Sequence, residues 1–547
     1  MSGKSTAWWR NSVIYQIYPR SFCDANGDGI GDLAGITQKL DYVQSLGVDA
    51  IWISPFFKSP MADFGYDVSD YRDVDPLFGN LDDFDRLIEA AHQRHLKVII
   101  DQILSHSSDQ HPWFRESRSS RDNPRADWYV WADPKADGSV PNNWMSNFGG
   151  TAWRWCSRRR QYYLTNFLEQ QPDLNLHNPA VQAQLLADLK FWLDRGVDGF
   201  RLDAINHAFH HQSLADNPPR PPALDERGLP PVNTYRYQWH VYDKSQPENL
   251  LFLQRVRQLL EQYPGTVAMG EVCDDKTQEI MADYTSGKRL HMAYSFDLLA
   301  EDCNADFLRE TLHKNRRVIA QGWPCWSIAN HDVPRPMTRW NKGFSNEQAR
   351  ARLPLFLLMQ LTLRGSVCLY QGEELGLEEA DIAFEDLRDP YGISLWPEFK
   401  GRDGCRTPMP WVDHGEINAG FSRVKPWLPV PPVHRGKAVS IQEEDPGSTL
   451  NQFRALLNWH RQWPGLAVAE QEVIEDGDAL LLFCRRAETE EFFVALNLGA
   501  GDETLTLPAR FADAEDITPA ILPGRCSAGQ LDLPLAGARV LRRPISQ

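Results

Sequence analysis

Short apolar runs alternate with longer stretches in which apolar residues recur every three or four positions, from residue 13 to about residue 462. The short runs predict buried strands, and the longer stretches predict amphipathic helices. Eight predicted strands alternate with helices in this way, which indicates an α/β fold built as a parallel (β/α)8 TIM barrel. The predicted strands are 13–16, 50–53, 97–101, 199–202, 267–270, 291–296, 326–329 and 365–369. The predicted helices are 33–46, 81–94, 179–195, 248–262, 346–363 and 448–462.

The alternation is interrupted after the third predicted strand and replaced near the end of the chain. About seventy residues rich in Trp, Asn, Arg and Pro follow the third strand and predict an inserted domain. Short alternating runs after residue 466 predict an antiparallel β domain. A Pro-rich loop at 212–247 is long enough to be a functional lid or a disordered segment. The predicted domains are 1–106 (barrel, first part), 107–175 (inserted domain), 176–465 (barrel, second part) and 466–547 (C-terminal β domain).

Charge and cysteine usage narrow the range of partners. Lys and Arg number 57 against 74 Asp and Glu, a net charge of −17, which argues against a nucleic-acid partner. No apolar run approaches the roughly 20 residues of a membrane-spanning helix, and the first ten residues contain no apolar signal segment. The nine scattered cysteines include no CxxC pair and favour reduced thiols. We expect a cytoplasmic monomer or homodimer with no membrane partner and no organic cofactor.

Polar residues follow several predicted strands at the same end of the expected barrel. Asp101 ends the third strand with His106 close behind, Arg201 and Asp203 end the fourth, and Glu271 ends the fifth. Asn330, His331 and Asp332 follow the seventh. Any one of these carboxylates could cap a helix or pair with an arginine. Four carboxylates, two histidines and an arginine at one end of successive strands indicate an active site instead.

Such a cluster suits the cleavage of an acetal. A retaining glycosidase uses one carboxylate as nucleophile and a second carboxyl group as acid and then base. Arg201 would keep the neighbouring Asp203 ionised, and partial burial would raise the pKa of Glu271 into the range of an acid/base. Asp332 would bind sugar hydroxyls and favour the oxocarbenium-like transition state.

The segments that carry these residues resemble the motifs of the α-amylase family of glycoside hydrolases, in the same order along the chain. One further segment, 171–175 (Gln-Pro-Asp-Leu-Asn), resembles the α-glucosidase and oligo-1,6-glucosidase branch of that family. The resemblance covers nearly the whole chain. The matching segments are 16–22, 101–106, 199–206, 270–272 and 330–332.

This resemblance implies a role for each matching residue. It makes Asp203 the nucleophile, Glu271 the general acid/base and Asp332 the transition-state stabiliser. Tyr66 would offer a stacking face to the terminal glucose, and a pair formed by Asp63 and Arg406 would close the pocket and make the enzyme exo-acting. The residues that it implies around the glucose are Asp63, Tyr66, His106, Arg201, His331 and Arg406.

The residue after the nucleophile bears on which linkage is cleaved. In relatives resembling this branch, Val at this position accompanies α-1,6 cleavage, whereas Ala or Thr accompanies α-1,4 preference. Ala204 therefore favours hydrolysis of terminal α-1,4-linked glucose from short oligosaccharides or α-glucosides. An acceptor hydroxyl can replace water in any retaining enzyme, so transglucosylation is also expected.

Three alternatives remain at this stage. The protein could be an oligo-1,6-glucosidase, or an isomerase of the same family that forms products such as trehalose or isomaltulose from maltose or sucrose. It could also be a non-catalytic transporter-subunit relative. That class would lack the catalytic carboxylates and carry a membrane segment, whereas this chain keeps every carboxylate.

The segment 24–32 carries oxygen-bearing side chains at alternate positions around a glycine, like the start of an EF-hand loop. Position 12 of that pattern is Gly35, so the bidentate Glu is missing. A turn in which Asp32 caps the next helix is the simpler interpretation. Similar loops in this family hold structural Ca²⁺ or Mg²⁺, and we expect one such ion here. The expected ligands are Asp24, Asn26, Asp28, the Ile30 carbonyl and Asp32.

Overall fold

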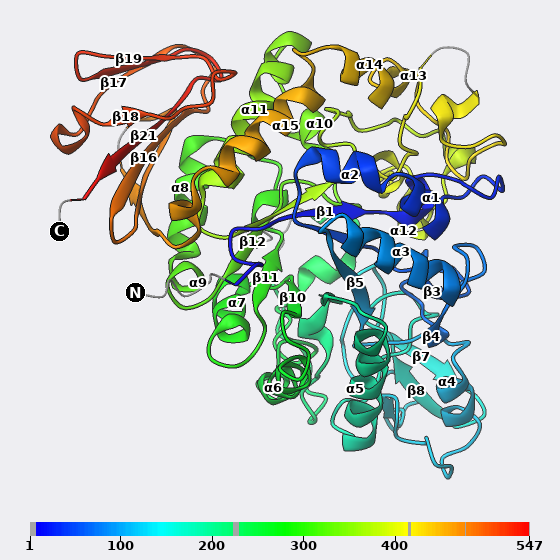
Figure 1. Ribbon diagram of the computed structural model, residues 1–547. Coiled ribbons are helices and arrows are strands. Elements are labelled where there is room, and N and C mark those ends of the chain that lie inside the picture. Colours follow the sequence, from blue (N-terminus) through cyan, green and yellow to red (C-terminus); the bar gives the residue numbers. More distant parts are fainter. Residues whose placement is uncertain (1–6, 222–228, 414–416, 476, 546–547) are drawn as a thin grey trace.

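Eight parallel strands close into a barrel at the centre of the molecule (Figure 1). The computed structural model describes residues 7–221, 229–413, 417–475 and 477–545. The strands follow one another around the barrel in sequence order, and the last pairs with the first, which confirms the predicted barrel. In chain order they are β1 (Val13–Ile17), β2 (Ala50–Ile53), β5 (Lys97–Ile103), β9 (Gly199–Asp203), β10 (Val267–Val272), β11 (Met292–Ser295), β12 (Pro324–Trp326) and β13 (Ser366–Tyr370).

The helices cover the outside of the barrel (Figure 1), and their ends carry the expected stop and start residues. Asn80 forms a capping box with Asp83 at the start of α3, and Pro179 occupies the first position of α5. Gly47 ends α2 in the left-handed conformation at φ 90°. The helices are α1 (Leu33–Gln38), α2 (Leu40–Leu46), α3 (Leu81–Gln93), α4 (Pro112–Ser117), α5 (Pro179–Asp194), α6 (Asn249–Leu260), α7 (Thr277–Thr285), α8 (Ala305–Lys314), α9 (Arg316–Gln321), α10 (Pro336–Arg339), α11 (Asn346–Thr362), α12 (Pro390–Leu395), α13 (Pro432–Arg435), α14 (Val439–Glu444) and α15 (Thr449–Arg461).

Alternate residues of each barrel strand point inward and stack in layers. Apolar side chains fill the lower part of the interior, among them Ile14, Ile99 and Met269. The next inward positions toward the carboxyl ends are polar, because side chains of a strand alternate between its two faces. Asp101 is two residues after Ile99, and Glu271 is two residues after Met269, so each lies on the same inward face as the apolar residue before it. The barrel therefore has an apolar floor beneath a polar upper layer.

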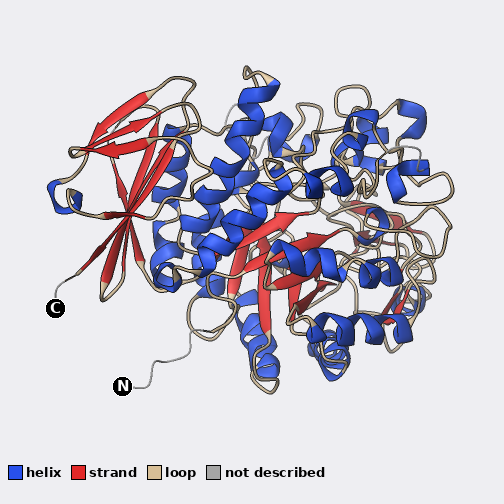
Figure 2. Ribbon diagram, turned by 45° about the horizontal axis from the view of Figure 1, so that its top comes forward, coloured by secondary structure: helices blue, strands red, loops and turns tan. Residues whose placement is uncertain are grey.

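Smaller sheets lie at the two sides of the barrel. Between β5 and α5 a three-stranded sheet forms, and a two-stranded hairpin lies between β2 and α3. After α15 the chain folds into one five-stranded and one three-stranded antiparallel sheet (Figure 2). The five-stranded sheet packs against α8 and α11. This confirms the C-terminal β domain. The remaining strands are β3 (Phe57–Lys58), β4 (Asp70–Val74), β6 (Trp131–Ala132), β7 (Trp153–Cys156), β8 (Gln161–Leu164), β14 (Glu470–Ile474), β15 (Leu480–Arg486), β16 (Glu490–Asn497), β17 (Glu503–Thr506), β18 (Glu515–Asp516), β19 (Arg525–Ser527), β20 (Gln530–Leu533) and β21 (Ala538–Pro544).

Several predicted elements differ from those observed. The helix predicted at 33–46 is two short helices, because the backbone leaves helical geometry at Lys39 (φ −102°, ψ 7°). The seventh strand is Pro324–Trp326 rather than 326–329, since the pairings with β11 and β13 begin at Pro324 and end at Trp326. The barrel helices α7, α8 and α9 were not predicted, and neither were the short helices α4, α10, α12, α13 and α14. The exact domain boundaries remain predictions.

The Pro-rich loop at 212–247 is long, as predicted. Its described part contains a short 3-10 helix, Thr234–Tyr237, and an isolated bridge between Pro219 and Gln238. Residues 222–228 of this loop lie outside the described part of the chain. All nine cysteines are free thiols. Among the helices that the structure describes, we find none that combines the length and the apolar character needed to traverse a bilayer.

Candidate active site

The polar residues predicted at the strand ends converge on one arginine. Arg201, on β9, is 1% exposed, and its guanidinium binds Asp203 at 2.6 Å and Asp101 of the neighbouring strand β5 at 3.0 Å. It also contacts Glu271 of β10, on its other side. Strand register explains this convergence, because Asp101 pairs with Arg201 and β10 lies next to β9. The buried guanidinium of Arg201 therefore forms ion pairs with three buried carboxyl groups.

The turn after β9 holds Glu271 from the side opposite Arg201. Ala204 adopts the left-handed conformation (φ 40°, ψ 39°), which is unfavourable for a residue with a side chain. This conformation directs the Ala204 backbone N–H at Glu271 Oε2, at 2.8 Å. The residue after the predicted nucleophile thus positions the predicted acid/base through its backbone.

Burial is the largest influence on the pKa values of the three carboxyl groups around Arg201. It raises the pKa of Asp203 to about 7 and that of Glu271 to about 7, while Arg201 opposes both rises. Burial also raises the pKa of Asp101 to about 6. Arg201 therefore acts in the direction expected from the sequence, but burial outweighs it, so the net change in the pKa of Asp203 is upward. Close to neutral pH, such a cluster holds both a protonated and an ionised carboxyl group.

Asp332 stays ionised because two arginines face it. Arg406 binds Asp332 at 2.9 Å, and Arg402 binds it at 3.2 Å. Burial alone would raise the pKa of Asp332, but His331, Arg402 and Arg406 outweigh it and hold this pKa below its usual value. Asp332 is thus a fixed negative charge at the wall of the site.

The pair predicted to close the pocket has a different arginine. Asp63 binds Arg402 at 2.9 Å, whereas Arg406 binds Asp332 and the His331 carbonyl oxygen, so the predicted pair of Asp63 and Arg406 is wrong. Arg402 can reach Asp63 because Asp389 holds its guanidinium from behind, at 2.8 Å and 3.0 Å. The sequence contains two arginines four residues apart, but their spacing does not show which of them pairs with Asp63.

The two histidines predicted at the site, His106 and His331, are buried and uncharged. Burial lowers the pKa of His106 and of His331 to about 3 in each case. The Tyr66 ring stacks on His331 with ring centroids 5.5 Å apart, and its hydroxyl lies 2.7 Å from His331 Nε2. Gln171 Nε2 lies 3.2 Å from both Asp63 Oδ2 and His106 Nε2. Gln171 belongs to the 171–175 motif but was not predicted as a site residue.

These side chains line a cavity of about 200 Å³ at the carboxyl ends of the strands. This volume lies below the ~300–1,000 Å³ of pockets that bury drug-sized ligands. The inserted segment supplies a wall through Phe148 and Phe167, and the loop after β13 supplies Tyr391. Asn233 ties these parts together, since its amide donates to the Asn147 carbonyl oxygen at 2.8 Å and to the Tyr391 hydroxyl at 2.7 Å. Of the predicted site residues, the cavity is lined by Asp63, Tyr66, His106, Asp203, Ala204, Glu271, His331 and Asp332, while Arg201 lies beneath it and Arg406 behind Asp332.

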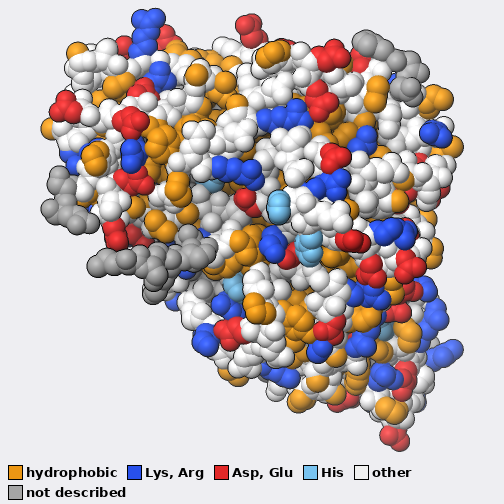
Figure 3. All heavy atoms as spheres, in the orientation of Figure 1, with side chains coloured by type: hydrophobic (Ala, Val, Ile, Leu, Met, Phe, Trp, Pro, Cys, Tyr) orange, Lys and Arg blue, Asp and Glu red, His pale blue; other side chains and the backbone are white. Residues whose placement is uncertain are grey.

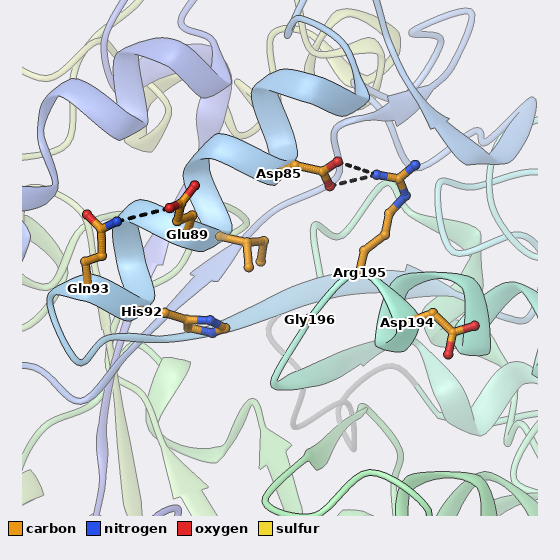
Figure 4. A pocket seen from close by; sticks show the side chains of 8 residues that line it. Asp85, Glu89, His92, Gln93, Asp194, Arg195 and Gly196 are labelled. Atoms are coloured by element: carbon orange, nitrogen blue, oxygen red, sulfur yellow. Dashed lines mark hydrogen bonds and ion pairs between the residues drawn. The ribbon is translucent and has the colours of Figure 1, made fainter.

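A larger groove of about 860 Å³ lies at the opposite end of the barrel, between the carboxyl ends of α3 and α5 (Figure 4). Its polar side chains bind one another or adjacent residues. Arg195 binds Asp85 through two contacts of 2.7 Å, and His92 binds Asp198 at 2.6 Å. These charges are satisfied within the protein, so the smaller cavity is the candidate active site. Acidic and basic side chains are mixed over the face shown in Figure 3.

The loop 24–32 closes on itself through Asx turns. Asp24 accepts the Gly27 and Gly29 amides at 2.6 Å and 2.8 Å, and Asp32 Oδ2 accepts the Ala25 and Asn26 amides at 3.1 Å. The other Asp32 oxygen caps α1 by accepting the Gly35 amide at 2.6 Å, as the simpler interpretation predicted. Within the described ranges, no group of three or more His, Cys, Asp or Glu side chains is spaced to hold a metal ion.

A closed parallel barrel that brings three carboxyl groups onto one arginine beside a small pocket has the architecture of a glycoside hydrolase. The chain belongs to the alpha-amylase family, because the model of the alpha-amylase catalytic domain matches residues 16–467.

Close relatives carry names from one branch of this family. A probable alpha-glucosidase of Rhizobium meliloti (strain 1021) is 54% identical over 92% of this chain and 91% of its own length. An oligo-1,6-glucosidase of Parageobacillus thermoglucosidasius is 36% identical over 92% of both chains. The crystal structure of the alpha-glucosyl transfer enzyme XgtA superposes with a TM-score of 0.95 at 54% identity, covering 98% of this chain and all of that one.

Proposed function

We propose that this protein is a retaining, exo-acting α-glucosidase that removes terminal α-1,4-linked glucose from short oligosaccharides or α-glucosides. The observation that carries this proposal is the shared contact of Asp203 and Glu271 with Arg201 at the floor of a small pocket. The ion pairs of Arg402 with Asp63 and Asp332 support a pocket that ends after one sugar. A relative named as a probable alpha-glucosidase supports the same activity.

The proposed reaction has two steps. The ionised Asp203 carboxylate attacks the anomeric carbon while the Glu271 carboxyl group gives its proton to the glycosidic oxygen, so the bond to the leaving group breaks as the glycosyl–enzyme bond forms. Glu271, now ionised, takes a proton from water, and the resulting hydroxide equivalent displaces Asp203. Two inversions retain the α configuration. Asp332 binds the sugar hydroxyls throughout.

We propose transglucosylation as a second activity of the same intermediate. A sugar hydroxyl in place of water would be deprotonated by Glu271 in the same way. The similarity to a protein described as an alpha-glucosyl transfer enzyme favours this proposal. The α-1,4 preference rests on Ala204, whose small side chain lines the pocket and leaves room for the leaving sugar.

Comparing maltose, isomaltose, sucrose and trehalose as substrates, with the released anomer followed by NMR, tests the function. We expect maltose to be cleaved fastest and the first glucose released to be the α anomer. Faster cleavage of isomaltose would identify an oligo-1,6-glucosidase, and isomerised disaccharides from sucrose or maltose would identify an isomerase. Release of the β anomer would contradict the retaining mechanism.

The pH dependence of kcat/KM is expected to be bell-shaped with its maximum near neutral pH. The rate falls as the pH drops, because Asp203 with its pKa raised to about 7 takes up a proton and ceases to be a nucleophile. It falls as the pH rises through about 7, because Glu271 loses the proton it must donate. The two apparent values belong to the coupled pair.

A Glu271→Gln variant checks the second limb of this profile. It should lose the alkaline fall in kcat/KM while retaining the acid one, with p-nitrophenyl α-glucoside as a substrate whose leaving group needs little protonation. An alkaline limb that persists in this variant would show that a group other than Glu271 causes it.

We propose that the loop 24–32 binds one Ca²⁺ or Mg²⁺ ion through side-chain oxygens of Asp24, Asn26, Asp28 and Asp32 and the Ile30 carbonyl. This donor set has the hard-oxygen chemistry that both ions prefer. Each carboxylate oxygen offers two lone pairs, so bonds to backbone amides leave acceptor capacity for a cation. The ion would stiffen the loop that precedes α1 and would take no part in the reaction.

Removal of the metal provides the test. Protein treated with EDTA should bind one Ca²⁺ per chain in calorimetry, and its unfolding temperature should rise on binding. Asp28→Ala should abolish both effects, because the hydrogen bonds of the Asp28 carboxylate to other described residues lie within its own loop. Asp41→Ala, which removes an exposed carboxylate from α2, serves as the control and should leave both effects intact. Absence of calorimetric binding of either ion would contradict the proposal.

We also propose a cytoplasmic location, supported by the nine free thiols. The strongly acidic net charge supports an uncharged oligosaccharide rather than a nucleic acid as the ligand. A monomer and a homodimer remain the two expected states.

A further inference from the structure

Gln16 is a buried polar residue inside the barrel that neither the sequence analysis nor the mechanism assigned a role. It lies on β1, two residues after the inward-facing Ile14, and is completely buried. Its strand neighbours are Trp52 and Tyr370. Burying an amide costs free energy unless its polar groups are bonded, so its partners indicate why it is there.

The Gln16 amide begins a chain of contacts that ends at the catalytic cluster. Gln16 Nε2 lies 3.1 Å from Ser54 Oγ and 2.8 Å from His331 Nδ1. The other ring nitrogen, His331 Nε2, lies 2.7 Å from the Tyr66 hydroxyl, which donates to Asp101 Oδ2 at 3.2 Å. Asp101 in turn binds Arg201.

His331 can serve this chain in one of two neutral forms. Burial lowers its pKa to about 3, so at neutral pH one ring nitrogen carries a proton and the other accepts a hydrogen bond. The ring cannot turn freely, because it is held between Tyr18 and Tyr66, each with its centroid 5.5 Å away. The partner of Nδ1 therefore decides what Nε2 presents to the pocket.

The two forms differ in how many buried groups they satisfy. If Gln16 donates to Nδ1, then Nε2–H donates to Tyr66, Tyr66 donates to Asp101, and the Gln16 Oε1 atom alone lacks a partner among the described residues. If the amide is reversed, Nδ1–H donates to Gln16 and Tyr66 donates to Nε2, so Asp101 loses its bond from Tyr66. Both amide hydrogens are then buried without an acceptor. The first form leaves fewer polar groups unsatisfied.

We propose that Gln16 is a positioning residue that holds His331 in the tautomer protonated at Nε2. Nε2–H then donates to the Tyr66 hydroxyl, which is left to donate its own proton to Asp101 Oδ2 beside Arg201. The expected effect on catalysis rests on the proposed function, whereas the tautomer is a property of the free protein.

NMR of deuterated protein carrying ¹⁵N only in histidine tests the proposal without a substrate. The His331 signals are those that disappear in His331→Asn. We expect an unprotonated Nδ1 and a protonated Nε2 in the wild type at neutral pH. In Gln16→Glu, the carboxylate should draw a proton onto Nδ1. In Gln16→Met, which removes the donor, the wild-type preference should be lost.

Kinetics and a matched variant separate positioning from packing. We expect kcat/KM for p-nitrophenyl α-glucoside to fall about tenfold in Gln16→Glu and Gln16→Met, as for one hydrogen bond of about 1.4 kcal/mol. Gln102→Met makes the same change at a completely buried glutamine of β5 whose amide has no hydrogen-bond partner among the described residues. This control should keep the wild-type tautomer and rate.

A wild-type His331 that is protonated at Nδ1, or at both nitrogens, would overturn the proposal even if the variants failed to fold. So would a Gln16→Met protein with an unchanged tautomer. If the wild type shows the expected tautomer but does not cleave α-glucosides, the proposed function fails and the role of Gln16 stands.

Discussion

Asp203→Asn is expected to lower kcat by at least about 10⁴-fold, because an amide cannot form the glycosyl–enzyme bond. The change preserves size and removes one charge from a residue that is 8% exposed and bound to Arg201 at 2.6 Å. The fold should tolerate it, since the cluster already has more carboxyl groups than cations. Steady-state kinetics on maltose, with circular dichroism to verify folding, measures the effect.

A control and a chemical rescue make this result specific. Asp188→Asn makes the same change at a buried residue of α5 that pairs with Arg72, away from the pocket, and should leave kcat unchanged. In Asp203→Ala, azide should enter the vacated space and displace p-nitrophenolate from the α-glucoside, giving the β-glucosyl azide by a single inversion. The α-glucosyl azide, or full activity of Asp203→Asn, would rule out Asp203 as the nucleophile.

Arg201→Met is expected to destabilise the protein by about 3–5 kcal/mol at mildly alkaline pH, because it leaves three buried carboxyl groups without their shared cation. The variant should be closer to the wild type at mildly acidic pH. Without Arg201 the folded-state pKa values of these carboxyl groups rise further above their unfolded values, so stability is retained at low pH and lost as the pH rises through them. Urea unfolding at both pH values measures the difference.

Arg72→Met provides the comparison for this prediction. Arg72 also pairs with a buried aspartate, Asp188, at 2.7 Å, but its own side chain is 44% exposed, so water can replace the lost partner. We expect a small loss of stability with little pH dependence. If Arg201→Met lost the same stability at both pH values, side-chain packing rather than charge would be its main contribution.

Much of the fold could be predicted from the local pattern of apolar and polar residues. Alternating apolar runs and helical periodicity predicted seven of the eight barrel strands in place and displaced the seventh, which is Pro324–Trp326. The prediction succeeds because strands buried on both faces are apolar throughout and helices on a sheet have one apolar face. The strand ends predicted Asp101, Arg201, Asp203 and Glu271 as one group, since the carboxyl ends of parallel strands meet at one edge. Helices α7, α8 and α9 were missed.

The ion-pair partners of the charged residues could not be predicted from this pattern. Arg402 and Arg406 are four residues apart in the sequence, yet Arg402 binds Asp63 and Asp389 while Arg406 binds Asp332. Partner choice depends on loops from distant parts of the chain meeting above the barrel.

The sequence by itself determined the barrel, its order of strands and the residue types at the strand ends, because these follow from periodicity and from the geometry of a parallel sheet. The folded structure was needed to show which carboxyl groups share Arg201, which arginine pairs with Asp63, and that burial outweighs Arg201 in setting the pKa of Asp203. These depend on distances and solvent exclusion among residues far apart in the chain, which no local pattern encodes.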